Sequence, residues 1–237
     1  LDLGAAMRFY RDRFADAGDF TFVLVGSFQP EAIRPLVLAW LGGLPTNGRR
    51  ETWKDIGVRP PDGVAEVRIR RGLEPKSQVQ LVFTGDARFS REARHQISSL
   101  ADVLDVRLRE VLREDMGAVY GVSVDAGLDR RPRERYTFTF TFGCAPEQVQ
   151  PLVQAVFAEI ESLQKNGVGD SYIQQMREKQ RRERETNLET NEFWLAAIEA
   201  YDSEGLDLRD LPRYEELVSK VDSKTIRDAA RRYLSRD

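Results

Sequence analysis

Cysteine and histidine are nearly absent from this sequence, which has one of each, Cys144 and His95, in 237 residues. One cysteine cannot form a disulfide within the chain, and it leaves no set of thiolates that could hold a metal ion. One histidine likewise excludes any zinc site that uses two histidine ligands. We therefore expect no metal site in this chain, with His95 on a helix surface and Cys144 packed as a small apolar residue.

An excess of charge of one sign is also lacking, because 36 basic and 39 acidic residues leave a net charge of −3. This balance gives no electrostatic basis for binding nucleic acid or an anionic membrane surface. No apolar run approaches the roughly 18 residues that a membrane span needs. The hydrophobic content of 41% is typical of a globular protein. We therefore expect neither nucleic acid nor a membrane as a partner.

The N-terminal part of the sequence predicts little structure that could bury its own core. Residues 1–14 have no signal-peptide pattern, and we expect the chain to be an excised fragment that begins inside a helix. Residues 20–26 are apolar and β-prone, which predicts a buried strand. A helical apolar pattern follows from Pro30 to Leu44.

Turn-forming residues are concentrated after this helix. Glycine and proline recur throughout residues 46–63, a composition typical of a linker or an extended crossover. We therefore predict that residues 1–45 end one domain and that residues 64–237 form a second domain.

The second part of the chain predicts alternating strands and helices. Strands are expected at residues 64–70, 78–83, 120–124 and 136–142. Helices are expected from Ser90 to Leu112 and over residues 147–165, 170–185, 190–203 and 223–235, with Ser90, Asp170 and Ser223 as caps. This order predicts an α+β fold, in which a mostly antiparallel sheet carries helices on one face.

The segment from Tyr136 to Phe142 gives the clearest period-two signal, because aromatic residues alternate strictly with threonines. Successive side chains of a strand point to opposite faces of the sheet. We expect the aromatic face to be buried and the face with Thr137, Thr139 and Thr141 to be wetter.

Arg113 and Tyr120 are the candidate site residues. They lie seven positions apart, where a long amphipathic helix ends and a strand begins. A guanidinium group and a phenol could direct hydrogen bonds to one carbonyl or developing oxyanion. Tyr120 could instead be a core aromatic on the face of Val122 and Val124, and Arg113 could be a cation favoured by the helix dipole.

Several segments, taken in order, resemble the M16 zinc metallopeptidases, the family of pitrilysin and insulin-degrading enzyme. They are residues 19–28, 44–45, 77–85, 104–124, 147–160, 170–179 and 221–226, and together they extend over nearly the whole chain. The resemblance is closer to PqqL-like bacterial zinc proteases than to mitochondrial processing subunits. It implies the C-terminal, non-zinc domain of this family, with an M16 metallopeptidase (LuxS-like) fold, preceded by the last strand and helix of another domain.

The resemblance also implies that Arg113 and Tyr120 bind substrate. The zinc motif of the family, His-x-x-Glu-His, does not occur at His95, so no metal ligand or catalytic base is assigned to this chain. Zinc is expected in the parent enzyme, on an M16 domain of the same chain or another. The fragment alone is expected to be inactive.

The implied function is that of a C-terminal fragment of a bacterial M16 zinc metalloendopeptidase. It would form a wall of the chamber that binds a peptide or unfolded protein, in the periplasm or cell envelope, and the threonine row could line that chamber. One alternative is a non-catalytic M16-like subunit for binding or assembly. A ferredoxin-like RNA-binding module is disfavoured, because the net charge is negative and residues 136–142 lack basic and glycine residues.

Overall fold

The computed structural model describes residues 2–115 and 119–235, except for the side chains of residues 113–115 and 120. The chain divides into two units. The first combines residues 1–54 with 187–208, and the second combines residues 55–186 with 209–237. Each unit is described by itself below.

The second unit contains the sheet and most of the helices. Its strands are β1 (Ser77–Asp86), β2 (Val119–Asp129) and β3 (Arg135–Cys144). Its helices are α3 (Arg91–Leu108), the π-helix η1 (Arg109–Asp115), the 3₁₀ turn η2 (Pro146–Gln148), α4 (Val149–Asn166), α5 (Asp170–Leu188), the 3₁₀ helix η3 (Leu208–Arg213), α7 (Tyr214–Lys220) and α8 (Ser223–Tyr233). The last two residues of α5 and the first residue of η3 belong to the first unit.

The three strands form an antiparallel sheet in the order β1-β3-β2, so β3 is central and the other two are edge strands. Phe140 lies opposite Leu81 of β1 and Val124 of β2. This register places apolar residues of all three strands on one face. It follows directly from the alternation in β3, because a shift by one residue would move the phenylalanines to the other face.

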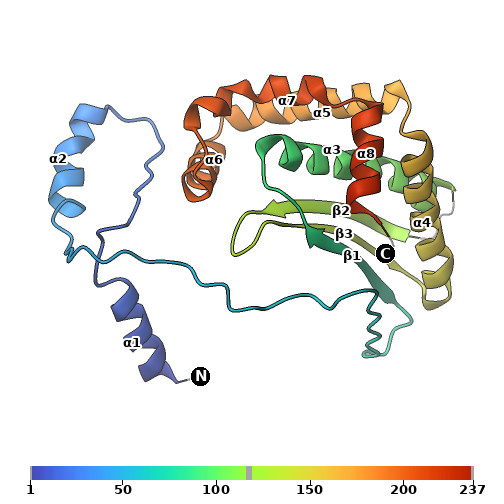
Figure 1. The fold of residues 1–237 in the computed structure, drawn as a ribbon, viewed down its shortest axis with the longest axis horizontal. Helices are drawn as coiled ribbons and strands as arrows, with labels where there is room; N and C mark the ends of the chain where they lie inside the picture. The colour runs from blue at the N-terminus through green and yellow to red at the C-terminus, as the bar shows by residue number, and fades with distance from the viewer. Residues whose placement is uncertain (1, 116–118, 236–237) are drawn as a thin grey trace. The chain divides into compact units, whose positions relative to one another are not determined.

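The core lies between this apolar face and the helices α3, α4 and α8, which Figure 1 shows on one side of the sheet. Phe138, Phe140 and Phe142 are almost completely buried, whereas the intervening threonines are only partly buried. Burial of each phenylalanine side chain stabilises the fold by about 2–3 kcal/mol, because it removes a large apolar area from water. The prediction of an α+β fold, with an antiparallel sheet and helices on one face, is confirmed.

The helix ends confirm one predicted cap and correct another. The Ser90 side chain accepts a hydrogen bond from the Ala93 amide, as predicted for the start of α3. At α8 the cap is Asp222, which accepts from the Thr225 amide. The prediction of Ser223 was wrong, because its hydroxyl instead donates to the Val168 carbonyl and accepts from the Val168 amide.

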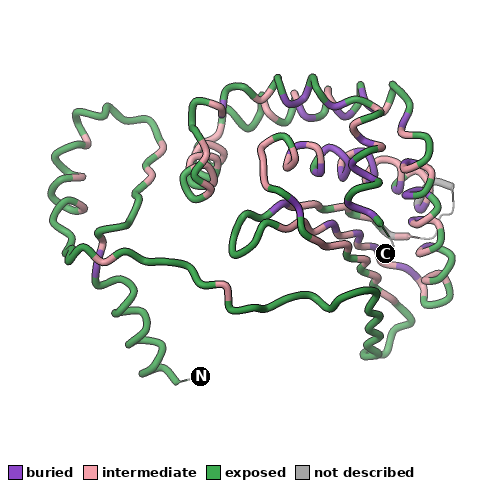
Figure 2. Tube along the Cα trace, viewed as in Figure 1, coloured by how far each residue is buried: buried purple, intermediate pink, exposed green. Residues whose placement is uncertain are grey.

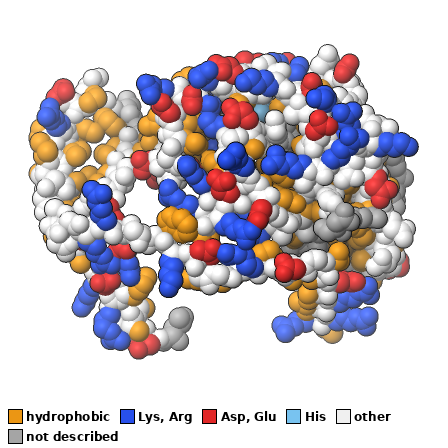
Figure 3. All heavy atoms as spheres, in the orientation of Figure 1, with side chains coloured by type: hydrophobic (Ala, Val, Ile, Leu, Met, Phe, Trp, Pro, Cys, Tyr) orange, Lys and Arg blue, Asp and Glu red, His pale blue; other side chains and the backbone are white. Residues whose placement is uncertain are grey.

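The first unit contains α1 (Leu3–Arg13), α2 (Pro30–Trp40) and α6 (Asn191–Glu204). None of these helices has a buried residue, as the colouring of Figure 2 shows. Apolar side chains therefore lie at the surface, and Figure 3 shows them around α2. Phe22, Leu38 and Trp40 are 45%, 61% and 77% exposed.

Two predicted strands do not form. Residues 20–26 and 64–70 form neither a helix nor a strand and belong to no sheet in the described part of the chain. A strand is defined by hydrogen bonds to a neighbouring strand, and neither segment has such a partner here. Their apolar side chains stay exposed, for example Val67 and Ile69. The strand prediction was therefore wrong for this chain, although the composition is β-prone.

Candidate functional site

Arg113 and Tyr120 lie at the junction that the sequence predicts. Arg113 is in the π-helix η1, which continues α3, and Tyr120 is the second residue of β2. The structure describes the backbone of both residues, but their side chains lie outside the described part. That the two side chains reach one point therefore stays a prediction.

The backbone is irregular on both sides of this junction. η1 has the i→i+5 hydrogen bonding of a π-helix, a rare conformation that is frequent at functional sites. In β2, Val119 lies opposite Cys144 and Val122 lies opposite Phe142, so the register shifts between Val119 and Val122. Register shifts of this kind include β-bulges, which re-aim side chains and are over-represented beside active sites.

The register shift bears on the alternative in which Tyr120 is a core aromatic. That alternative assumes unbroken alternation from Tyr120 to Val122 and Val124. Because the shift falls between Val119 and Val122, the face of Tyr120 does not follow from the faces of the two valines.

Two polar contacts hold the end of α3 and the start of η1. Arg107 of α3 makes two hydrogen bonds to Glu159 of α4, and the Arg107 Nη2 to Glu159 Oε2 distance is 3.1 Å. The Tyr172 hydroxyl of α5 donates to Glu110 Oε2 of η1 at 2.6 Å. The Arg107 guanidinium also lies 5.1 Å from the Tyr172 ring centroid. Residues from three helices therefore meet beside η1.

These contacts shift the ionisation of the groups that make them. The hydrogen bond to Glu159 raises the pKa of Arg107, which outweighs the opposing effect of burial. The hydrogen bond to Glu110 is the main cause that raises the pKa of Tyr172. The phenol therefore keeps its proton at neutral pH and donates a hydrogen bond to the Glu110 carboxylate.

His95 is buried, so the prediction of a surface histidine was wrong. Its ring packs edge to face on Tyr214 of α7, with 5.4 Å between the centroids. Burial is the main cause that lowers the pKa of His95, while Asp102 opposes the shift. The helix α7 encloses this flank of α3, and the periodicity of α3 alone does not reveal that contact.

Cys144 is buried at the end of β3, as predicted for a small apolar residue. Burial raises the pKa of its thiol, which disfavours the nucleophilic thiolate. The residues present do not fit a zinc site. Among the side chains that the structure describes, no group of three histidine, cysteine, aspartate or glutamate residues is arranged to hold a metal ion.

The threonine face of the sheet is polar and accessible. Thr141 lies between Gln80 of β1 and Ser123 of β2, both of which are exposed. Thr139 lies beside the exposed Asp125 of β2. This face therefore offers hydroxyl and amide groups across all three strands.

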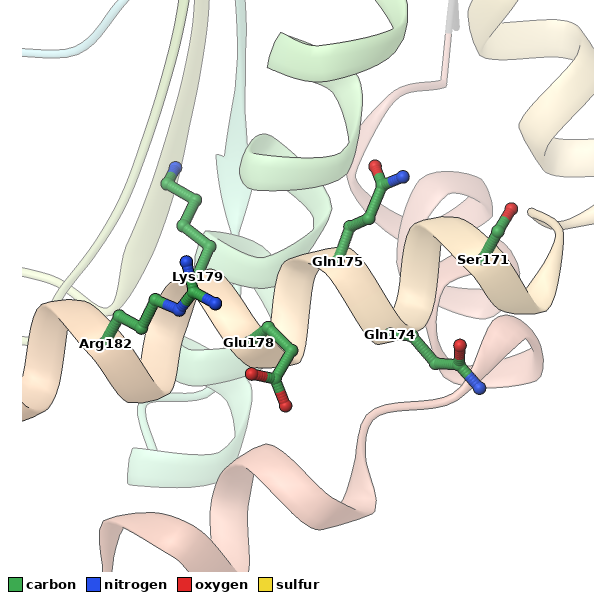
Figure 4. A pocket seen from close by; sticks show the side chains of 6 residues that line it. All are labelled: Ser171, Gln174, Gln175, Glu178, Lys179 and Arg182. Carbon is green, nitrogen blue, oxygen red and sulfur yellow. The ribbon is translucent and has the colours of Figure 1, made fainter.

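A shallow depression of about 450 Å³ lies on α5 and is shown in Figure 4. Its lining consists of Ser171, Gln174, Gln175, Glu178, Lys179 and Arg182, all from this one helix. Lys179 already binds Asp102 of α3 at 2.5 Å. The lining contains no nucleophile paired with a base, so it does not form a catalytic site.

Residues 2–180 match the family model described as the peptidase M16 inactive domain. The chain belongs to this M16 domain family. A zinc protease PQQL-like of Arabidopsis thaliana is 30% identical over 207 residues, which cover 81% of this chain and 22% of that protein. The chain therefore spans about a fifth of the length of this curated relative.

Solved structures share the fold of this M16 domain. The periplasmic protease PqqL from Escherichia coli superposes with a TM-score of 0.78 at 19% identity, over 98% of this chain and 26% of that chain. A peptidase M16 inactive domain from Pseudomonas fluorescens gives a TM-score of 0.57 at 19% identity, over 69% of this chain and 40% of that chain. The recognition of the family from sequence is confirmed.

Some residues around the junction of this M16 domain were not predicted from sequence. Glu159 did leave a signal, because it falls at helical spacing between Val156 and Leu163, on the apolar stripe of α4. A charged residue at a core-facing position predicts a buried partner. Tyr172 and Glu110 left no such signal, since a tyrosine and a glutamate are ordinary on a helix surface.

In the part of the chain that the structure describes, no helix combines the length and apolar composition that crossing a membrane requires.

Proposed function

We propose that this chain is the C-terminal part of a bacterial M16 zinc metalloendopeptidase and that Arg113 and Tyr120 bind its substrate. The observation that carries the proposal is the irregular backbone at their junction. Arg113 lies in a π-helix and Tyr120 lies where the register of β2 shifts, and such irregularities are frequent at functional sites.

In the proposed chemistry, this domain and the zinc-bearing domain have different roles. Zinc and its activated water belong to another M16 domain, because this chain offers one histidine and no cluster of ligands among its described residues. Arg113 and Tyr120 would donate hydrogen bonds to the peptide carbonyl as it becomes an oxyanion. The substrate would be a peptide or an unfolded protein, held against this domain as one wall of a chamber.

The polar face of the sheet supports a role as part of that wall. Threonine hydroxyls and neighbouring amide groups suit hydrogen bonds to an extended peptide. The exposed apolar surface of the first unit supports the proposal that residues 1–45 end a preceding domain, with 46–63 as linker and 64–237 as the C-terminal domain. A periplasmic or cell-envelope location is proposed from the similar periplasmic protease.

The test is cleavage of an unfolded peptide by the full-length protein that contains this chain. We expect a zinc chelator to abolish cleavage and Tyr120→Phe to lower kcat/KM about 10²–10³-fold, the usual effect of losing one oxyanion donor. Tyr136→Phe is the matched control, because Tyr136 lies opposite Leu128 at the other end of the sheet.

Two results would contradict the proposal. A Tyr120→Phe rate within a few-fold of wild type would assign Tyr120 to structure rather than substrate binding. A folded full-length protein that cleaves nothing and carries no His-x-x-Glu-His motif would instead indicate a non-catalytic subunit.

A further inference from the structure

Among the described side chains, Tyr172 of α5 donates a hydrogen bond that holds the π-helix η1 from outside. Tyr172 donates to Glu110 at 2.6 Å, and Glu110 is the second residue of the seven-residue helix that also contains Arg113. We infer that Tyr172 and Glu110 are positioning residues that set the place of Arg113. This inference rests on the substrate-binding role proposed above for Arg113.

The hydrogen bond between Tyr172 and Glu110 fixes the direction of the contact and also holds α5 and η1 together. The acceptor is a carboxylate, so the hydrogen bond is charge-assisted and short. The Tyr172 ring is itself fixed, because the Arg107 guanidinium lies 5.1 Å from its centroid. Arg107 is held in turn by two hydrogen bonds to the buried carboxylate of Glu159. The phenol therefore has little freedom to turn away from Glu110.

The neighbouring residues explain why this hydrogen bond bears on Arg113. Leu108 and Leu112 are completely buried, so the inner side of the turn is anchored in the core. Glu110 provides an anchor toward α5 within the same turn. Glu110 and Arg113 are three residues apart in a helix whose hydrogen bonds join i and i+5, so a shift of one moves the backbone of the other.

Other polar contacts join α5 to α3, but they lie farther along the two helices. Gln180 donates to Ser99 at 3.0 Å and to Asp102 at 2.9 Å. These contacts hold α5 against α3 about two to three turns before η1 begins. They provide a matched control, since removing one of them weakens the same helix pair without releasing the π-helix.

The experiment measures peptide cleavage by the full-length protein with Tyr172→Phe, which removes the hydroxyl and keeps the ring. We expect kcat/KM to fall about 10- to 100-fold, mainly through kcat, because a small displacement of a positioning group has effects of that size. Ser99→Ala should leave kcat/KM within about twofold of wild type, although it also removes a hydrogen bond between α3 and α5.

Coupling to Arg113 separates positioning from general stability. In the Arg113→Ala background, Tyr172→Phe should cause no further loss, because the group that it positions is already absent. Glu110→Gln keeps an acceptor for the tyrosine and should retain more activity than Glu110→Ala. Thermal unfolding of each variant checks that the protein remains folded.

The possible results distinguish this inference from the proposed function. If Arg113→Ala lowers kcat/KM but Tyr172→Phe does not, the positioning role is wrong and the substrate-binding role stands. Losses that multiply in the double variant would also overturn positioning, since the two residues would then act independently. If Arg113→Ala itself has no effect, the proposed function fails and the positioning role fails with it.

Discussion

The two units of this chain have similar sequence patterns and very different burial. Both α2 in the first unit and α3 in the second carry apolar residues at helical spacing. Eight residues of α3 are buried, whereas α2 has none. Periodicity therefore predicts that a helix forms and which side is apolar, but burial depends on a partner surface.

The strands show the same contrast. Residues 20–26 and β1 are both rich in β-forming residues, but β1 pairs along its length with β3. The first segment has no ladder in the described part of the chain and leaves Phe20, Phe22 and Leu24 exposed. Pairing, which supplies the backbone hydrogen bonds, is what distinguishes the two segments.

Truncation of an aromatic side chain should show the difference in burial between the two units most strongly. Phe140→Ala should destabilise the 237-residue chain by about 3–5 kcal/mol, because the ring is completely buried at the centre of the sheet. Phe22→Ala should cost less than about 1 kcal/mol, since that ring is already 45% exposed. Urea unfolding of both variants measures the difference, and equal losses would contradict the separation of the units.

Removal of an arginine should show the same dependence on burial within the second unit. Arg107→Leu leaves the carboxylate of Glu159 buried without its partner, which should cost about 3 kcal/mol. Arg181→Leu should cost much less, because Arg181 and Glu215 form a pair at the surface. Chemical denaturation of both variants in low and high salt measures the two losses of stability. An equal cost for both variants would show that burial does not control these ion pairs.

Two helix caps provide a smaller test. Asp222 caps α8, which packs on the core, and Asp2 caps α1, which has no buried residue. Asp222→Ala should lower the free energy of global unfolding by about 1 kcal/mol. Asp2→Ala should leave it unchanged and reduce only the local helicity of α1, measured by amide hydrogen exchange. A global effect of Asp2→Ala would indicate that α1 unfolds together with the core.

The pH dependence of stability should show the smallest effect, at His95. Burial lowers the pKa of His95 in the folded chain below its ordinary value of 6.5, so the unfolded chain takes up the proton first. The stability that neutral His95 contributes is present above pH 6.5 and is lost as the pH falls below it. His95→Phe keeps an aromatic ring beside Tyr214 and should flatten this part of the profile. Urea unfolding measures the stability of both proteins against pH. Identical pH profiles for wild type and His95→Phe would contradict the assignment of this effect to His95.

The sequence predicts burial well for residues whose buried face follows from the periodic pattern of their own strand or helix. The alternation from Tyr136 to Phe142 predicts the central strand and its buried face, and the stripes of α3 and α4 predict the helices that cover it. His95 was misplaced because its burial comes from α7, a seven-residue helix that the sequence pattern did not reveal. Arg113 and Tyr120 were proposed from their residue types, their spacing and the M16 resemblance, and their joint role stays a prediction. The π-helix and the register shift of β2 depend on tertiary packing.

The most direct test of the central claim compares two arginines of the same π-helix in the full-length protein. Arg109 is exposed and pairs with Asp105 one turn earlier, so Arg109→Ala should change kcat/KM for peptide cleavage by less than about twofold. Arg113→Ala should lower it about 10²–10³-fold while the protein remains folded. Equal, small effects of the two substitutions would contradict the claim that this M16 domain supplies a substrate-binding arginine.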